Sequence, residues 1–166
     1  MNMIEIKAAS SILDYIQIEA LANTIWYEHY RPIIGENQVN YMLEKFQSVS
    51  AIKEQIDNGF EYFIVIFDKK PVGYMAVKQE PEFLFLSKIY ILNNHRGKNL
   101  GRKMLCFIEE NAKNKNLKNI RLTVNINNTN SIKAYEKWGF QKSGTLVTDI
   151  GNGFVMDDFE MIKTLL

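Results

Sequence analysis

A short basic loop with the sequence HRGKNLG, residues 95–101, follows a strand-like segment and precedes a helix-like one. A helix N-terminus presents unpaired backbone N–H groups and about half a positive charge, so phosphate groups bind there. Gly97 and Gly101 allow a ligand to approach the backbone closely. Three cations lie in or beside the loop: Arg96, Lys98 and Arg102. The loop therefore predicts a phosphate-binding site, although a solvated basic loop before a surface helix would have the same composition.

The composition excludes several classes of protein. The 166 residues fit one domain, residues 1–166, and 46% of them are hydrophobic. Twenty basic against 19 acidic residues give a net charge of +1, which argues against nucleic acid as a partner. The sequence has neither the apolar segment of a signal peptide nor one long enough to span a membrane. We therefore expect a cytoplasmic protein without a membrane partner.

The only cysteine, Cys106, rules out an intrachain disulfide. It lies within a helical pattern, so we expect a small buried hydrophobic residue rather than a nucleophile.

The first half of the sequence predicts one strand and three helices. The strand covers residues 4–9, and Ser10 or Ser11 caps a helix that ends near Tyr27, before the breaker RPIIG. The inward residues of this helix are expected to be Ile12, Ile16, Leu21 and Ile25. A second helix follows from the apolar spacing of Val39, Met42, Leu43 and Phe46. A third begins after Ser48 or Ser50, covers residues 51–59 and ends at Asn58-Gly59.

The second half alternates strands with two helices. Strands are predicted at residues 60–68, 72–80, 83–92 and 119–125, and near 140–150 and 153–166. Helices are predicted at 100–116 and 129–139. The fold class is therefore α/β (α+β), with a mixed, mostly antiparallel sheet of six to seven strands and helices on both faces.

Two motifs in this order resemble the GNAT superfamily of N-acetyltransferases, and the resemblance covers roughly residues 3–163. The first motif is Arg96–Gly101, whose amides hold the pyrophosphate of acetyl-CoA in that family. Asn99 replaces the middle glycine, and asparagine tolerates the left-handed backbone conformation better than most residues. The second is NNTNSIKAYEKWGF, in which the resemblance implies that Asn130 contacts the pantetheine arm and that Tyr135 lies next to the thioester sulfur.

The resemblance implies a GNAT-like fold in which the fourth and fifth strands splay apart and acetyl-CoA binds between them. The Ile91 N–H is then the expected oxyanion donor, and no metal is expected. The implied cofactor-binding residues are Tyr90, Ile91, Leu92, Arg96, Gly97, Lys98, Asn99, Leu100, Gly101, Arg102, Asn130, Lys133 and Lys137.

The implied reaction is direct attack of a primary amine on the acetyl thioester. Tyr135, with an ordinary pKa of about 10, is the expected catalytic residue, because a protonated phenol can donate to the departing sulfur. Its neighbours Trp138 and Phe140 are expected in the core. The general base is open, because Ser87 lies near a position where some relatives carry a glutamate. The candidates are a water chain, Glu28, His29, Glu80, Glu82 and Asp157.

The front half and the closing stretch TDIGNGFVMDDFEM resemble bacterial spermidine/spermine-type acetyltransferases, so a polyamine is the leading acceptor. Acidic and aromatic side chains suit such a cation. The residues expected to line its pocket are Trp26, Tyr27, Glu28, Tyr30, Asp157 and Asp158. Alternative acceptors are a protein N-terminus, an amino acid or an antibiotic amine. A non-catalytic acetyl-CoA-binding module and an ATP-binding enzyme are rival classes, and a homodimer is a further expectation.

Overall fold

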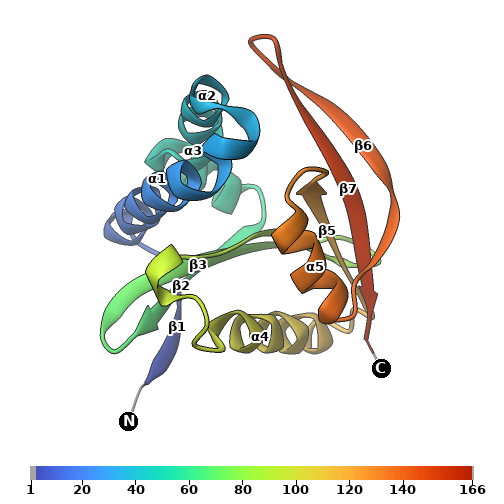
Figure 1. The fold of residues 1–166 in the computed structure, drawn as a ribbon. Coiled ribbons are helices and arrows are strands. Elements are labelled where there is room, and N and C mark those ends of the chain that lie inside the picture. Colours follow the sequence, from blue (N-terminus) through green and yellow to red (C-terminus); the bar gives the residue numbers. More distant parts are fainter. Residues whose placement is uncertain (1–2, 166) are drawn as a thin grey trace.

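The computed structural model describes residues 3–165 and contains one seven-stranded sheet with the order β1-β2-β3-β4-β5-β7-β6 (Figure 1). Only the neighbours β4 and β5 are parallel, and the other pairs are antiparallel. The strands are β1 (Ile4–Ala8), β2 (Phe60–Phe67), β3 (Lys70–Gln79), β4 (Leu84–Ile91), β5 (Asn119–Asn125), β6 (Gln141–Gly151) and β7 (Phe154–Thr164). The predicted mixed, mostly antiparallel sheet is confirmed.

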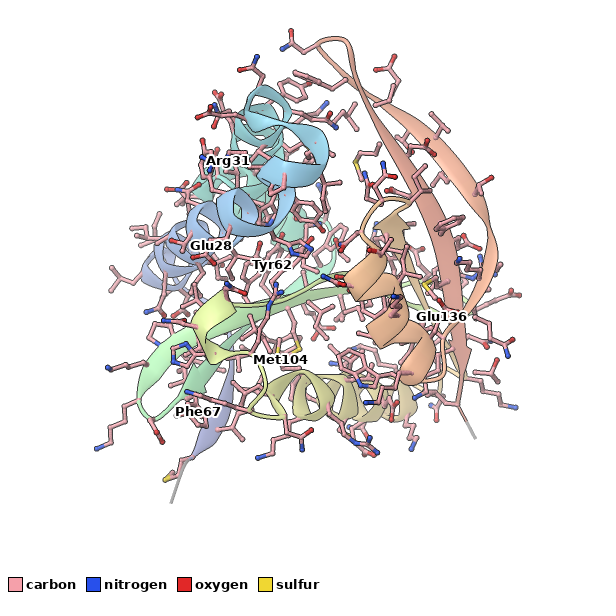
Figure 2. The ribbon with its side chains drawn as sticks, viewed as in Figure 1. Glu28, Arg31, Tyr62, Phe67, Met104 and Glu136 are labelled. Carbon is pink, nitrogen blue, oxygen red and sulfur yellow. The ribbon has the colours of Figure 1, made fainter. Side chains whose placement is uncertain are left out.

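Helices cover both faces of the sheet and create two hydrophobic cores. The elements are α1 (Ile12–Ile34), α2 (Glu36–Gln47), α3 (Val49–Asp57), the short 3-10 helix η1 (Asn93–His95), α4 (Leu100–Asn114) and α5 (Thr129–Lys137). Helices α1 to α3 pack on one face and α4 and α5 on the other. Figure 2 shows Tyr62 and Met104, which belong to the first and the second of these cores. None of the helices among residues 3–165 has the length and apolar character needed to cross a membrane.

Helix α1 begins where the sequence predicts but extends further. Ser11 accepts a hydrogen bond from the Asp14 N–H, and the Asp14 carboxylate accepts from the Ser11 N–H, so the two form a capping box. The predicted end near Tyr27 is wrong, because the helix continues through Pro32 to Ile34. A proline this close to the end removes only one helical hydrogen bond, since the Gly35 N–H still donates to the Arg31 carbonyl.

Two of the four residues expected on the inner side of α1 point outward. Leu21 and Ile25 are buried, as predicted, but Ile12 and Ile16 are 59% and 50% exposed. Ile18 is fully buried instead. The first turns of α1 carry apolar residues on more than one face, so their periodicity does not identify the inner side.

The prediction for Cys106 is also wrong, because its side chain is exposed. The buried positions of α4 are Leu100, Met104, Leu105, Ile108 and Ala112. This spacing of four residues places position 106 on the opposite face of the helix.

Strands β4 and β5 pair only at their beginnings, as the predicted splay requires. Leu84 pairs with Ile120 and Phe85 with Arg121, after which the two strands separate. Beside this point β4 also contains a bulge, because Ala76 of β3 faces Lys88 while Val77 faces Leu86. Ser87 is therefore an extra residue in the strand, and the bulge redirects the side chains around it.

Candidate active site

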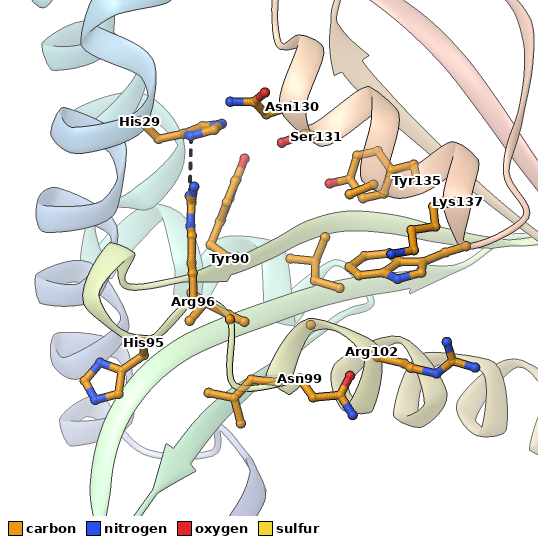
Figure 3. A pocket seen from close by; sticks show the side chains of 17 residues that line it. His29, Tyr90, His95, Arg96, Asn99, Arg102, Asn130, Ser131, Tyr135 and Lys137 are labelled. Atoms are coloured by element: carbon orange, nitrogen blue, oxygen red, sulfur yellow. Dashed lines mark hydrogen bonds between the residues drawn. The ribbon is translucent and has the colours of Figure 1, made fainter.

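The first cavity, of about 560 Å³, lies between the end of β4, the start of α4, and helices α1 and α5 (Figure 3). Its wall includes every residue of the basic loop 95–101 except Lys98. The residues that line it are His29, Ile89, Tyr90, Ile91, His95, Arg96, Gly97, Asn99, Leu100, Gly101, Arg102, Asn130, Ser131, Ala134, Tyr135, Lys137 and Trp138.

The start of α4 is built to hold an anion. Asn99 precedes the helix with φ 61° and ψ 19°, so it takes the left-handed conformation expected of the glycine that it replaces. Its side chain makes no capping hydrogen bond, which leaves the first N–H groups of α4 without a side-chain acceptor. Gly97 has a φ of 79°, and a Cβ atom on Gly101 would lie 2.9 Å from the Trp138 ring. Both glycines are therefore required by the local geometry.

Arg96 connects the loop to helix α1 across one side of the first cavity. Its guanidinium lies 3.5 Å from Nδ1 of His29, as the dashed line in Figure 3 shows. Burial and the nearby Arg96 charge lower the pKa of His29 below its ordinary value. A neutral histidine at this position can accept a proton.

Tyr135 lines the first cavity from α5, and its ring packs against Trp138 and Phe140. Burial raises its pKa well above the ordinary value for a phenol. The hydroxyl therefore stays protonated near neutral pH and can donate a hydrogen bond to a ligand. Phe140 is buried as expected, whereas Trp138 is only partly buried and forms part of the cavity wall.

A second cavity, of about 350 Å³, lies where helices α1 to α3 face the sheet. It is lined by Tyr30, Ile34, Gln38, Met42, Phe46, Gln55, Phe60, Phe85, Ser87, Lys88, Tyr90, Thr123, Val124, Asn125, Met156 and Asp158. Tyr90 lines both cavities, and its hydroxyl lies 2.9 Å from that of Tyr30. The two cavities therefore adjoin at Tyr90, next to the separation of β4 from β5.

Two ionisable groups of opposite charge line the second cavity. Asp158 is 4% exposed, and burial together with the neighbouring Asp157 raises its pKa to about 6. Burial lowers the pKa of Lys88 to about 8, and its Nζ donates to Ser87 Oγ at 2.7 Å. Near neutral pH the cavity therefore contains one carboxylate and one ammonium group.

Most of the predicted cofactor residues line the first cavity, but three do not. Leu92 packs in the core beneath α1, and its N–H donates to the Val72 carbonyl. Lys98 turns away, with Nζ 5.2 Å from the centre of the Phe67 ring. Lys133 is exposed on α5 and is not part of the cavity wall. These three residues therefore lie outside the wall of the first cavity.

Some of the predicted acceptor residues line the second cavity and others do not. Tyr30 and Asp158 line the second cavity. Trp26 does not, because it is 2% exposed and donates from Nε1 to the Tyr74 hydroxyl at 3.0 Å. Three others line neither of the two cavities: Tyr27, Glu28 and Asp157.

Among the five side chains considered as a general base, only His29 lines one of the two cavities. Glu82 is exposed, and Glu80 lies 3.9 Å from Lys78. Sequence reasoning did not name the residues that α2 and α3 contribute to the second cavity, which are Gln38, Met42, Phe46 and Gln55. The amphipathic pattern of α2 marked Met42 and Phe46 as inward-facing, which was the available signal.

Comparison with known proteins identifies the class to which this fold and site belong. The Acetyltransferase (GNAT) family matches residues 22–140, and the chain belongs to this family. It is an acetyltransferase, as the two sequence motifs indicated.

Two kinds of relative are similar to the chain. The spermine/spermidine N(1)-acetyltransferase of Bacillus subtilis (strain 168) is 36% identical over 124 residues, which are 68% of this chain and 79% of that protein. The PaiA N-acetyltransferase of Thermoplasma acidophilum, solved in complex with coenzyme A, superposes with a TM-score of 0.81. This match covers 98% of this chain and 99% of the other at 23% identity, and it shows a shared fold.

The same fold is found in the ribosomal-protein-S18-alanine N-acetyltransferase from Escherichia coli. That structure superposes with a TM-score of 0.72 at 15% identity, over 99% of this chain and 94% of the other. Since these named relatives act on different amines, the fold alone does not identify the acceptor.

Proposed function

We propose that this protein transfers the acetyl group of acetyl-CoA to a small primary amine by direct attack. The proposal is based mainly on one observation: two cavities meet at Tyr90, in the part of β4 that no longer pairs with β5. One cavity has the features of a phosphate site and the other those of an amine site. A reaction between two bound substrates requires this arrangement, because it holds the reacting atoms together.

The first cavity suits acetyl-CoA along its length. The uncapped start of α4, with Gly97, Gly101 and Arg96, is matched to a pyrophosphate. Asn130 and Ser131 line the same cavity from α5 and are the proposed polar partners of the pantetheine arm. The Ile91 N–H is the proposed donor to the thioester oxygen, because the edge of β4 that faces β5 has no strand partner at this point, whereas β3 pairs with the other edge.

The reaction forms a C–N bond to the acetyl carbon and breaks its C–S bond, and the amine loses a proton. At pH 7 only about one alkylamine in a thousand is neutral, so a proton acceptor is needed. His29 on one side of Tyr90 and Asp158 on the other are the two proposed acceptors. Tyr135 supplies a hydrogen bond to the departing sulfur, which leaves as the thiol of coenzyme A.

Polyamines are the first acceptors to test, because two curated relatives carry the names of spermine or spermidine acetyltransferases. Asp158 provides a carboxylate for a protonated amine, and Tyr30 and Phe46 provide aromatic surface. An amino-acid-like amine is the second candidate, and Lys88 in the same cavity is the observation that favours it.

The test measures release of the coenzyme A thiol from acetyl-CoA with a panel of amines. The panel contains spermidine, spermine, amino acids, aminoglycosides and peptides with free N-termini. Turnover above the hydrolysis rate with at least one amine supports the proposal. Binding of acetyl-CoA, seen as a rise in melting temperature, without turnover of any amine would instead identify a binding module. Stabilisation by ATP but not by acetyl-CoA would favour a nucleotide enzyme.

We propose in addition that two copies associate through the β6–β7 hairpin. Strand β6 is the edge of the sheet, and residues 141–149 are all exposed. The hairpin projects from the rest of the molecule (Figure 1) and carries exposed Leu146 (47%), Val147 (65%) and Val155 (50%). A second copy would cover this surface. Light scattering after size exclusion should give the mass of a dimer, and L146D together with V147D should give a monomer.

A further inference from the structure

The second cavity contains a positive charge that amine binding does not explain. Sixteen residues line this cavity, and Lys88 is the only lysine or arginine among them. The remaining surface is largely apolar or aromatic, as in Met42, Phe46 and Met156. A site designed only for polycations would not carry an ammonium group, because like charges repel most strongly where water is scarce.

Among residues 3–165, the Lys88 ammonium group has no carboxylate partner. The ion pairs among residues 3–165 join other lysines and arginines to carboxylates, and none includes Lys88. Its one hydrogen bond goes to Ser87 Oγ, which leaves two of its three donors available. A half-buried ammonium group without a counter-charge is costly, so an anion that enters the cavity gains by pairing with it.

The backbone of β4 fixes where this charge lies relative to the reaction. Lys88 follows the bulge at Ser87 and stands two residues before Tyr90, at which the two cavities meet. Two residues of strand span about 6.6 Å. Asp158 lies in β7, on the other side of β5, where burial and Asp157 raise its pKa, and no ion pair between Asp158 and Lys88 occurs among residues 3–165. The cavity therefore presents separate positive and negative groups.

From these observations we propose that the acceptor carries an anionic group as well as its reactive amine, and that Lys88 binds this group while Asp158 faces the amine. The proposal rests on the function proposed above and narrows the acceptor to an amino-acid-like class, with a carboxylate or phosphate several ångströms from the nitrogen. A polyamine offers no group that could pair with Lys88.

Matched acceptors test the proposal directly. The panel pairs 5-aminovalerate with 5-aminovaleramide, and L-phenylalanine with L-phenylalaninamide, so that each pair differs in one negative charge. O-phosphoethanolamine against ethanolamine distinguishes phosphate from carboxylate, and spermidine represents the polycations. The wild type should prefer the anionic member of at least one pair by about tenfold or more in kcat/KM, the range expected for a charge-assisted contact.

The variant K88M keeps an unbranched side chain, one atom shorter than that of lysine, and removes its charge. In K88M the ratio of kcat/KM for the anionic acceptor to kcat/KM for its matched partner should fall close to one, mainly through a higher KM for the anionic acceptor. The kcat/KM for spermidine should rise. K118M, which removes an exposed lysine before β5, is the control and should retain the wild-type preference.

The pH dependence of the preference gives a second readout. The ratio for 5-aminovalerate over its amide should decline as the pH rises through about 8, where Lys88 loses its charge. The other titratable groups of the cavity are Tyr30, with a pKa of about 12, Asp158, with a pKa of about 6, and Tyr90, whose pKa burial raises well above its ordinary value. Only Lys88 therefore changes its charge in this range. K88M should show a flat ratio.

The possible outcomes separate this inference from the function on which it rests. Equal use of both members of every pair by the wild type would overturn it, and so would an unchanged preference in K88M. An equal fall of kcat on both members would also overturn it and would make Lys88 a proton acceptor instead. If no amine is acetylated, the proposed function fails. Calorimetric titration of 5-aminovalerate and its amide into wild type and K88M then decides whether Lys88 binds the anion.

Discussion

The hydroxyl groups of Tyr30 and Tyr90 lie 2.9 Å apart at the junction of the two cavities. Burial raises the pKa of Tyr30 to about 12 and that of Tyr90 well above its ordinary value, so both phenols remain protonated. Since one hydroxyl donates to the other, one hydrogen of the pair is left for a third partner. The pair thus presents neutral hydrogen-bonding groups at the place where the proposed sites of the two substrates meet.

A double-mutant cycle on Y30F and Y90F should measure this contact. Each single variant leaves a buried hydroxyl without its partner and should lower the free energy of unfolding by about 1–3 kcal/mol. The double variant should cost less than the sum, with a coupling of about 0.5–1.5 kcal/mol by urea denaturation. Strict additivity would show that the hydrogen bond contributes nothing.

Arg96 and Lys98 should differ in their effect on acetyl-CoA binding, although both belong to the basic loop. Arg96 lines the first cavity, whereas Lys98 lies over the Phe67 ring. R96A should weaken acetyl-CoA binding at least tenfold, because a charge-assisted contact to phosphate contributes roughly 1.5–3 kcal/mol. K98A should change it less than about threefold. Calorimetry with both variants provides the comparison, and equal losses would show that overall loop charge, rather than position, determines affinity.

Y135F should separate catalysis from packing, because it removes one oxygen and keeps the ring. If the phenol donates to the departing sulfur, turnover should fall by about 10²–10⁴-fold while acetyl-CoA binding changes little. Thiols have a pKa near 8.5, so the deficit should shrink as the pH rises from about 6.5 to 9.5. Y27F is a suitable control, since Tyr27 lines neither cavity. An unimpaired Y135F enzyme would remove Tyr135 from the mechanism.

The raised pKa of Asp158 predicts how stability depends on pH. Its folded pKa of about 6 exceeds the ordinary value of 3.8, so the folded state holds the proton more tightly than the unfolded state does. The contribution of Asp158 to stability should therefore fall as the pH rises from about 4 to 6 and stay low above that range. D158N should be more stable than wild type above pH 6 and equally stable near pH 3.5.

Melting temperatures across this pH range test the prediction, with D57N as a control. Asp57 forms an exposed ion pair with Lys53 and should show no such crossover. A parallel pH dependence in D158N and wild type would show that the Asp158 pKa is not raised.

The sequence was most informative where a local rule determines the structure. A cap at Ser10 or Ser11 gave the start of α1, and the spacing of Val39, Met42 and Leu43 gave the inner face of α2. The left-handed conformation of Asn99 followed from the motif around it. In each case the signal lies within a few residues of the feature that it specifies.

The second cavity could not be predicted in this way, because its wall is assembled from segments far apart in the sequence. Gln38 comes from α2, Lys88 from a strand bulge, and Asp158 from β7. The bulge at Ser87 has no glycine or proline to indicate it, and its register depends on pairing with β3. The position of Trp26 in the core depends likewise on a partner 48 positions away, because its Nε1 donates to the Tyr74 hydroxyl.

Strands β4 and β5 are joined by only two residue pairs, and this short pairing also affects the lifetime of the protein in a cell. Beyond Phe85 the inner edge of β4 is without a neighbouring strand, and backbone with few partners opens more readily. A ligand bound along this edge at 100 times its dissociation constant would add about 2.7 kcal/mol to the free energy of unfolding. Proteases that cleave transiently opened chains would then act more slowly when acetyl-CoA is abundant. The lifetime of the protein would in this way follow the supply of acetyl groups.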